Sequence, residues 1–244
     1  MGWMSADSSS SSSSSDGCSS SSSCSSSSSP LLPTLAKSTY LKKYKKVKKT
    51  VGKVKVCKAL KKAAPQAAKL FKGTLASTGE EFRACARVWS DKFYKKINRA
   101  IIKDDADKLD EWAPFIRYLN RHIVDNPTMK RLKVYRGSRM NNAATRKLKS
   151  GKCYRLGMYV ATSKSKQVAK DFSKSGWILK MEIPEGCHNA GDISSLSLFA
   201  AETEVLLPPY TAVRITEVDR KKRCINADVL DNLEVAETVP TTLA

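Results

Sequence analysis

The sequence predicts an α+β protein, in which a helix-rich part precedes a strand-rich part. Apolar residues recur at helical spacing between Gly79 and Val124. Beyond Leu132 the pattern changes to short apolar or alternating segments of the kind that form strands. With 244 residues the chain is long enough for one sizeable core. We therefore expect one folded domain over residues 79–244, preceded by two segments of different composition.

The first 36 residues are of low complexity. Nineteen of the first 29 residues are serine, which leaves too little apolar area to offset the entropy of ordering. We predict a disordered tail over residues 1–36, either a plain solvated linker or a phosphorylated segment.

Residues 37–78 form a lysine-rich segment that we expect to be partly helical. Between Lys37 and Lys72 there are 14 lysines and no acidic residue, whereas residues 73–244 hold 30 basic and 21 acidic side chains. The net charge of +21 therefore comes largely from this segment. Such a segment binds nucleic acid or another anionic surface by counterion release. A solvated charged tail is the alternative.

Composition also bears on compartment and metal content. The seven cysteines form no C-x-x-C pair, and neither histidine adjoins a ligand set, so we predict no metal site. Scattered thiols, no signal peptide and no apolar run of membrane-spanning length predict a soluble protein of the cytoplasm or nucleus. A protein packaged in a virion, or exported without a signal peptide, fits these features equally. We also expect a monomer.

Two helices are predicted in the first part of the domain. The first begins near Gly79, and its apolar face consists of Phe82, Cys85, Ala86, Trp89, Phe93 and Ile97. The second covers about Asp107–Val124, and its apolar face consists of Leu109, Trp112, Ile116, Leu119 and Ile123.

The second part is predicted to contain five strands, of which the third alternates most clearly between apolar and polar residues. They are Lys133–Arg136, Gly157–Ala161, Trp177–Ile183, Glu202–Leu207 and Ala212–Val218. Apolar residues at 168, 169 and 172 predict a helix that packs behind the second strand.

Polar residues stand at the ends of three of these strands. Arg136 is expected to close the first strand, where its planar guanidinium can grip a phosphate while Gly137 lets the backbone turn closely. A surface arginine at a turn is the alternative. Thr162 and Ser163 follow the second strand, and their hydroxyls could cap the next helix or hydrogen-bond a carboxylate.

Two carboxylates begin the fourth predicted strand. Because strand side chains alternate, Glu202 and Glu204 should share one face, about 6–7 Å apart along the backbone. A bare pair of this kind is usually an exposed edge. Here the apolar Val205-Leu206-Leu207 follows directly, which places the pair at the mouth of a buried strand.

These motifs, in this order, resemble those of the arginine-specific mono-ADP-ribosyltransferases. The resemblance rests on V-Y-R-G at 134–137, A-T-S at 161–163 and L-S-L-F-A-A-E-T-E-V-L-L-P-P at 196–209, and it covers about residues 80–220. It implies a helical lobe followed by two packed, mainly antiparallel sheets that form an NAD cleft.

The resemblance also implies roles for individual residues. Arg136, with Gly137 beside it, would hold the NAD pyrophosphate, and Thr162 and Ser163 would support the nicotinamide ribose. Glu204 would bind the ribose and stabilise the cation that develops as nicotinamide leaves. Glu202 and Phe199 would bind the acceptor, an arginine side chain of a target protein, with Glu202 orienting its guanidinium. Members without the first glutamate modify other residues, so this pair is typical of arginine transfer.

One position departs from the pattern. Where the family often has serine, this chain has Ala161, so the missing hydrogen bond must come from Ser163, the backbone or water. Two alternatives stay open beside arginine transfer. One is an NAD glycohydrolase, and the other is a polyanion-binding protein with an inactive domain of this fold.

Overall fold

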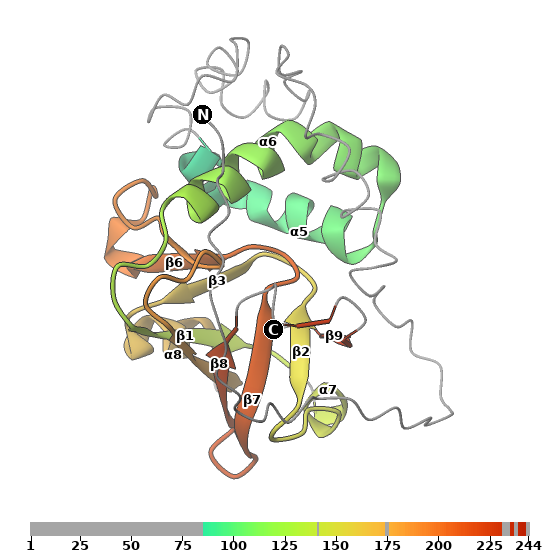
Figure 1. Ribbon diagram of the computed structural model, residues 1–244, viewed down its shortest axis with the longest axis vertical. Coiled ribbons are helices and arrows are strands. Elements are labelled where there is room, and N and C mark those ends of the chain that lie inside the picture. Colours follow the sequence, from blue (N-terminus) through green and yellow to red (C-terminus); the bar gives the residue numbers. More distant parts are fainter. Residues whose placement is uncertain (1–84, 141, 174–175, 231–234, 237–238, 243–244) are drawn as a thin grey trace, which may run out of the picture. The chain divides into compact units, whose positions relative to one another are not determined.

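The computed structural model describes residues 85–242, apart from residues 141, 174–175, 231–234 and 237–238 (Figure 1). The predicted tail at 1–36 and the lysine-rich segment at 37–78 lie outside the described residues, so both stay predictions. Within the described part of the chain, no helix has the length and apolar character that a membrane span requires.

The helical part contains the two predicted helices, but the first is kinked, and its predicted start from Gly79 to residue 84, with Phe82, lies outside the described residues. Helical residues 85–88 lead into the π-helix η3 (Trp89–Phe93) and then into α5 (Tyr94–Ile102). Within η3 the backbone of Asp91 leaves the helical region, with φ −69° and ψ −161°. Such π segments are rare and occur often at functional sites.

The second helix is α6 (Ala106–Asp125), and its start is capped as helix chemistry predicts. The Asp105 carboxylate accepts a hydrogen bond from the Lys108 backbone N–H at 3.1 Å. Trp112, Leu119 and Ile123 are buried, as their spacing predicted.

The strands of the described residues form one sheet, in the order β5-β6-β3-β1-β4-β8-β7-β2-β9. Their bounds are β1 (Leu132–Ser138), β2 (Cys153–Leu156), β3 (Val160–Ser163), β4 (Trp177–Ile183), β5 (Gly191–Asp192), β6 (Glu204–Leu207), β7 (Ala212–Asp219), β8 (Cys224–Val229) and β9 (Thr241–Thr242). Three short helices lie between strands: α7 (Asn142–Arg146), α8 (Lys166–Ser173) and the 3₁₀ helix η4 (Ala200–Glu202). The α+β class is therefore confirmed.

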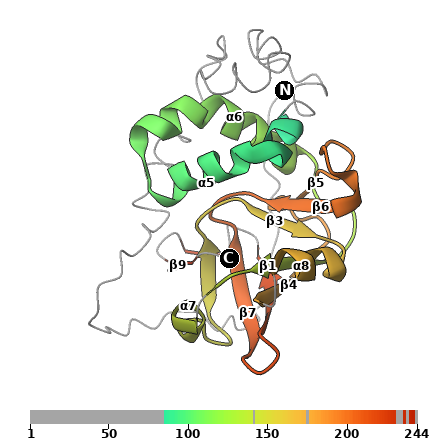
Figure 2. The ribbon, with the colours of Figure 1, turned by 180° about the vertical axis from the view of Figure 1, so that it is seen from behind.

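The sheet is mainly antiparallel, with parallel pairing only between β4 and β8 and between β2 and β9 within the described residues. We expected two packed sheets, whereas the hydrogen bonding is continuous. The continuity is weakest between β1 and β3, which pair only at Tyr135 and Ser163, while β1 and β4 pair along all of β1. This weak seam lets the sheet curl, so that β6 and β3 run across the direction of β7 and β2 (Figures 1 and 2).

Two hydrophobic cores lie on opposite faces of the β3–β6 pair. The helices pack on one face, against Tyr159 and Leu206, and the rest of the curled sheet encloses Val160, Val205 and Leu207 on the other. Every residue of β6 is buried as a result. This explains the continuous apolar run of β6, because a strand covered on both faces has no solvent side.

Several strand predictions need correction. β1 continues to Ser138, so Arg136 lies inside a strand and does not close it. β3 begins later than predicted and includes the hydroxyl pair. Our predictions missed β2, β5, β8 and β9. The helix after β3 is present as α8, but its Phe172 is exposed while Ala169 and Ser173 are buried.

Candidate active site

Arg136 lies in the middle of β1, at the seam with β3. Its Nη1 donates a hydrogen bond to the Ala161 carbonyl at 2.9 Å. Its Nε is buried and has no hydrogen-bond partner among the described residues. Burial lowers the pKa of Arg136 to about 10, although the nearby Glu204 and Tyr94 act to raise it. A part-buried guanidinium whose buried Nε has no partner among the described residues is suited to an anionic ligand.

Gly137 is required by the packing of α8 against β1, and not by a turn around a ligand. A Cβ built at Gly137 would lie 2.1 Å from the Ala169 carbonyl oxygen and 2.6 Å from the Ser173 backbone nitrogen, both in α8. Glycine is needed here because helix and strand backbones approach too closely for any side chain. The close turn around a ligand that we predicted is thus corrected, and ligand binding by Gly137 itself stays a prediction.

Glu204 is the first residue of β6, and its carboxylate points into the helical core. The side chain is 6% exposed, and its Oε1 accepts a hydrogen bond from Trp89 Nε1 at 2.9 Å. Burial raises the pKa of Glu204 to about 7. The Trp89 hydrogen bond and the charge of Arg136 lower this pKa, whereas Glu202 adds to the increase. Glu204 therefore changes charge close to neutral pH.

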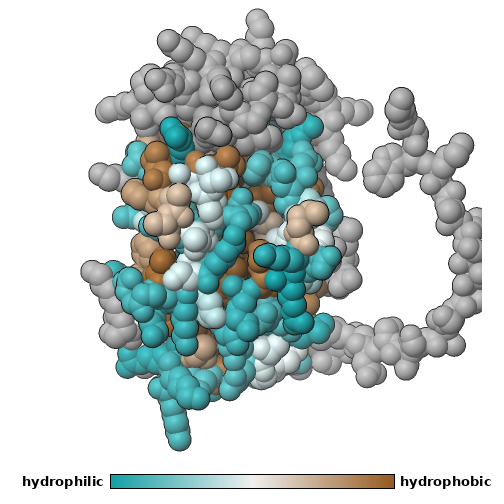
Figure 3. All heavy atoms as spheres, turned by 90° about the vertical axis from the view of Figure 1, so that its left-hand side faces the viewer, coloured by the Kyte–Doolittle hydropathy of each residue, from teal (hydrophilic) through white to brown (hydrophobic). Residues whose placement is uncertain are grey.

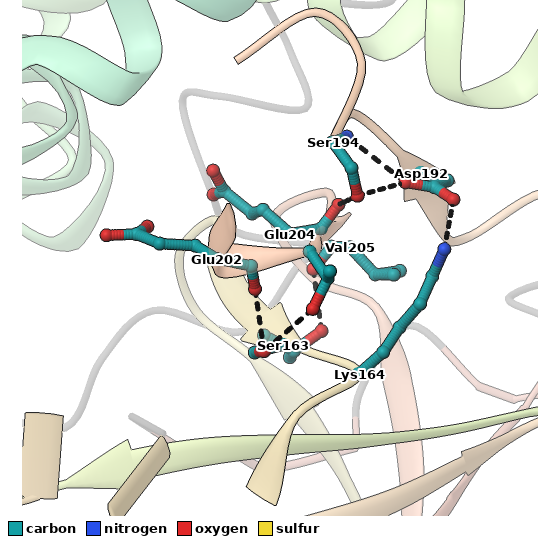
Figure 4. Close-up of polar contacts among 9 residues, drawn as sticks. Ser163, Lys164, Asp192, Ser194, Glu202, Glu204 and Val205 are labelled. Atoms are coloured by element: carbon teal, nitrogen blue, oxygen red, sulfur yellow. Dashed lines mark hydrogen bonds and ion pairs between the residues drawn. The ribbon is translucent and has the colours of Figure 1, made fainter. Parts of the chain in front are cut away.

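Glu202 does not belong to the strand, which corrects our expectation of two carboxylates at strand spacing. It ends the 3₁₀ helix η4, and Thr203 links it to β6 in the left-handed conformation, with φ 47° and ψ 49°. Nevertheless, Figure 4 shows both carboxylates extending to the same side of the start of β6. The left-handed residue, and not strand alternation, therefore brings the two side chains together. Partial burial raises the pKa of Glu202.

The hydroxyls of Thr162 and Ser163 hydrogen-bond to backbone atoms and do not contact the Glu204 carboxylate. Ser163 donates to the Glu202 carbonyl at 2.7 Å and lies 3.2 Å from the Thr203 hydroxyl oxygen. Thr162 points to the opposite face and donates to the Val205 carbonyl at 2.6 Å. Ser163 also accepts from the Ser165 N–H at 2.9 Å. The pair therefore fixes the turn and strand that carry the two glutamates.

A second polar group supports the start of β6 from the other side (Figure 4). Lys164 forms an ion pair with Asp192 of β5, and Ser194 donates its hydroxyl to the same carboxylate at 2.6 Å. The Glu204 carbonyl accepts from the Ile193 N–H at 3.0 Å. Although burial acts to raise it, hydrogen bonds from Lys164 and Ser194 lower the pKa of Asp192.

Phe199 stands directly before η4 and is 52% exposed, next to the exposed Leu198. The turn is tied to the helical part, because the Ser197 hydroxyl lies 2.9 Å from the Ser90 hydroxyl oxygen. On the face shown in Figure 3, hydrophobic and hydrophilic residues are interspersed in the upper and middle parts of the coloured surface, while hydrophilic side chains cover most of its lower part. The exposure of Phe199 leaves its role in acceptor binding a prediction.

Sequence reasoning missed two residues of this site. Trp89 was assigned only to the core, although a buried indole N–H generally requires an acceptor, and that requirement was the available signal. Asn98 of α5 clamps the backbone before β3, accepting from the Tyr159 N–H and donating to the Tyr159 carbonyl, both at 3.0 Å. In the part that the structure describes, no three His, Cys, Asp or Glu side chains form a group that could hold a metal ion.

Comparisons with known proteins identify the family and the fold of this chain. A family model described as ADP-ribosyltransferase exoenzyme matches residues 41–239, and this match begins inside the lysine-rich segment. The search of curated proteins found no match.

Solved structures of similar fold include three bacterial proteins. The ADP-ribosyltransferase Vis of Vibrio splendidus, in complex with agmatine, has a TM-score of 0.54 and 19% identity, covering 69% of this chain and 81% of that one. The toxin Plx2a of Paenibacillus larvae has a TM-score of 0.52 and 19% identity, covering 62% and 87%. C3stau2 of S. aureus, solved with NAD, has a TM-score of 0.52 and 21% identity, covering 73% and 99%. At these identities the similarity shows the fold.

Proposed function

Because the chain belongs to the ADP-ribosyltransferase exoenzyme family, we propose that it transfers ADP-ribose from NAD to arginine side chains of proteins and releases nicotinamide. The observation that carries the proposal is the grouping of three charged side chains. Arg136 has an unused buried donor, Glu204 is buried close enough for its charge to act on Arg136, and Glu202 extends on the same side as Glu204.

The fit to NAD rests on Arg136. A pyrophosphate bears two negative charges and accepts hydrogen bonds through several oxygens, which suits a guanidinium whose Nε is buried and unpartnered. Binding would satisfy this donor and compensate the burial that lowers the pKa of Arg136. Without a ligand, the contacts among the described residues leave part of the cost of burying this guanidinium uncompensated, and such costs are common at ligand sites.

Glu204 supplies the electrostatic part of the reaction. The bond between ribose C1′ and the nicotinamide nitrogen breaks, and its electron pair leaves with nicotinamide, which becomes neutral. The positive charge then lies on the ribose, where the Glu204 carboxylate can face it. This carboxylate is 6% exposed, and in such a site a charge interaction exceeds its value in water. The interaction is stronger with the cation than with the ground state, which is the condition for acceleration.

Glu202 is suited to the acceptor. Glu202 is part-exposed, no hydrogen bond from the described residues reaches its carboxylate, and its backbone N–H donates to the carbonyl of the exposed Phe199 at 2.9 Å. A guanidinium can pair bidentately with such a carboxylate. Its nitrogen then forms the new bond to C1′, and the proton it loses passes to Glu202 or to solvent. The similar Vis toxin binds agmatine, a guanidinium compound, which supports an acceptor of this chemistry.

The test is incubation of the full chain with labelled NAD and a mixture of proteins. We expect label on protein, its release by hydroxylamine under conditions that cleave arginine adducts, and loss of both in Glu204→Gln. Label that resists hydroxylamine would show that the acceptor is another residue. In Glu202→Gln, nicotinamide release should persist while protein labelling falls.

NAD glycohydrolysis is the second candidate, because the same open Glu202 carboxylate can face water in place of a guanidinium. Free ADP-ribose measured against protein-bound label separates the two reactions. A large excess of free ADP-ribose, even with abundant protein acceptor, would favour hydrolysis.

For residues 37–72 we propose binding to nucleic acid or another anionic surface. Support comes from the 14 lysines without an acid in this segment. Affinity for a nucleic acid should fall steeply with salt, and the same chain with these lysines replaced by glutamine is the control. A salt-independent affinity would contradict the electrostatic explanation. This segment and the scattered thiols also lead us to propose a cytoplasmic or nuclear location, with virion packaging or export as alternatives.

A further inference from the structure

We propose that Trp89 is the positioning residue of Glu204, and that its indole N–H holds this carboxylate in the charged, oriented form that the reaction uses. The inference rests on the proposed function, because it assigns a role within the same site.

The contact itself is direct. Trp89 Nε1 lies 2.9 Å from Glu204 Oε1, and both residues are buried, at 2% and 6% exposure. An indole N–H can only donate, so it favours the carboxylate, which is a stronger acceptor than the protonated carboxyl group. A hydrogen bond to a charged acceptor in a buried site is among the stronger ones in proteins.

The indole is held in place by its surroundings. The Trp89 ring packs on the Tyr159 ring, with centroids 5.0 Å apart and planes at 60°, and on Tyr94 at 6.1 Å. The Tyr159 hydroxyl donates in turn to Asn120, a second residue inside the helical core. Trp89 also begins η3, where the backbone departs from the α-helix. These contacts hold the indole where its N–H reaches the Glu204 carboxylate at the start of β6.

No hydroxyl on β3 competes for this carboxylate. Ala161, Ser163, Glu204 and Leu206 share the helical face of the β3–β6 pair, because Ala161 pairs with Leu206 and Ser163 with Glu204. Ala161 carries no donor, and the Ser163 proton goes to the Glu202 carbonyl at 2.7 Å. Among the described residues, the donor to the Glu204 carboxylate is Trp89. The burial that raises the pKa of Glu204 is opposed first by this bond.

The activity test compares Trp89→Phe with wild type across pH 5.5–9.5, following nicotinamide release from NAD. Phenylalanine keeps an aromatic ring against Tyr159 and removes the donor. We expect kcat to fall about tenfold to a hundredfold at pH 7, since hydrogen bonds to charged groups have this magnitude. The KM for NAD should change less. The rising limb of the kcat profile should move to higher pH by about one unit, because the charged form loses its donor.

Two further variants separate positioning from packing. Trp112→Phe makes the same substitution in the same core, where Trp112 packs on Phe93 and Phe115 without reaching Glu204, and its pH limb should match wild type. Adding Ala161→Ser to Trp89→Phe returns a hydroxyl to the face of β3 that carries Ser163, and it should bring the limb back toward wild type. If the rising limb of the kcat–pH profile lies at the same pH in Trp89→Phe, in wild type and in Trp112→Phe, the proposal is overturned.

A second readout does not depend on activity. The chain has four tryptophans, so the indole ¹H–¹⁵N spectrum is simple to assign. The Trp89 signal should titrate near pH 7 in wild type and should not titrate there in Glu204→Gln. A signal that ignores Glu204 contradicts the inference, whatever the enzyme does. A titrating signal in a protein that releases no nicotinamide would leave the contact intact and refute the proposed function instead.

Discussion

Two arginines of the sheet, Arg155 and Arg136, show how a structural cation differs from one that we propose binds a ligand. Arg155 of β2 is 0% exposed, and its guanidinium donates to the backbone carbonyls of Tyr210, Val235 and Ala236. Arg136 makes one such bond, to Ala161, and keeps a buried Nε without a partner in the described residues.

The difference between them lies in what surrounds each guanidinium. The chain folds its own C-terminal residues around Arg155, so that the cation joins β2 to the segment that leads into β9. Around Arg136 the sheet is at its weak seam, where few backbone groups are available. A donor that the fold itself satisfies contributes to stability, whereas one left unsatisfied is available to a ligand at a cost in stability.

Glu204→Gln should produce the largest effect on activity. It extends the comparison of the two arginines to a buried carboxylate. Loss of the charge that faces the developing cation should lower kcat/KM for NAD by about a thousandfold or more. The variant keeps an oxygen for Trp89 and should fold. The measurement is nicotinamide release, and activity near the wild-type level would refute the electrostatic role of Glu204.

The same variant should be more stable than wild type at high pH. Because burial raises the folded-state pKa of Glu204 from 4.5 to about 7, the folded state binds more protons than the unfolded state between these values. The charged carboxylate therefore costs stability as pH rises through this range. Each pKa unit corresponds to about 1.4 kcal/mol, so the advantage of Glu204→Gln should grow by about 3 kcal/mol between pH 4 and pH 8. Urea unfolding at both pH values measures it, and a pH-independent difference would contradict the raised pKa.

Arg155→Lys should reduce the free energy of unfolding by about 3 kcal/mol, because one ammonium cannot serve carbonyls at Tyr210, Val235 and Ala236 together. Hydrogen exchange should show the pairing of β2 with β9 opening first. Turnover of NAD should remain near wild type below the melting temperature. The comparison of the two arginines fails if Arg155→Lys loses turnover while keeping its stability.

Arg136→Lys should show the opposite result. Lysine keeps the charge but loses the bidentate fork, so kcat/KM for NAD should fall by about a hundredfold. The melting temperature should stay the same or rise, because a buried unsatisfied donor is removed. Thermal unfolding with and without NAD tests both statements, since the stabilisation by NAD should shrink in this variant.

Asp192→Asn should have the smallest effect. Its ion pair with Lys164 is partly exposed, which limits its contribution to about 1 kcal/mol or less. However, its acceptor oxygens also hold Ser194 near the start of β6, so kcat should fall by up to about tenfold. The matched control is Asp219→Asn, which breaks the surface pair with Lys222 at the end of β7 and should leave kcat unchanged. Equal kcat values in the two variants would exclude a positioning role for Asp192.

The glutamate motif shows how far sequence reasoning reaches. It correctly identified Glu202 and Glu204 as neighbours beside a buried strand, because the apolar run of β6 is local information. It was wrong about the geometry, since the left-handed backbone of Thr203 is a conformation that a threonine residue rarely adopts. Similarly, Gly137 was correctly singled out, but its partner α8 could not be inferred before the packing was known.

The sequence by itself determined the order of helices before strands, the α+β class and the charged residues placed beside the start of β6. Those properties depend on periodicity and residue type, which act over a few positions along the chain. Only the tertiary structure decided that Trp89 donates to a carboxylate 115 residues away, that Arg155 is structural and that Arg136 is left with a free donor. Burial and hydrogen bonding between distant segments decide such roles, and both exist only once the curled sheet and the helices have packed together.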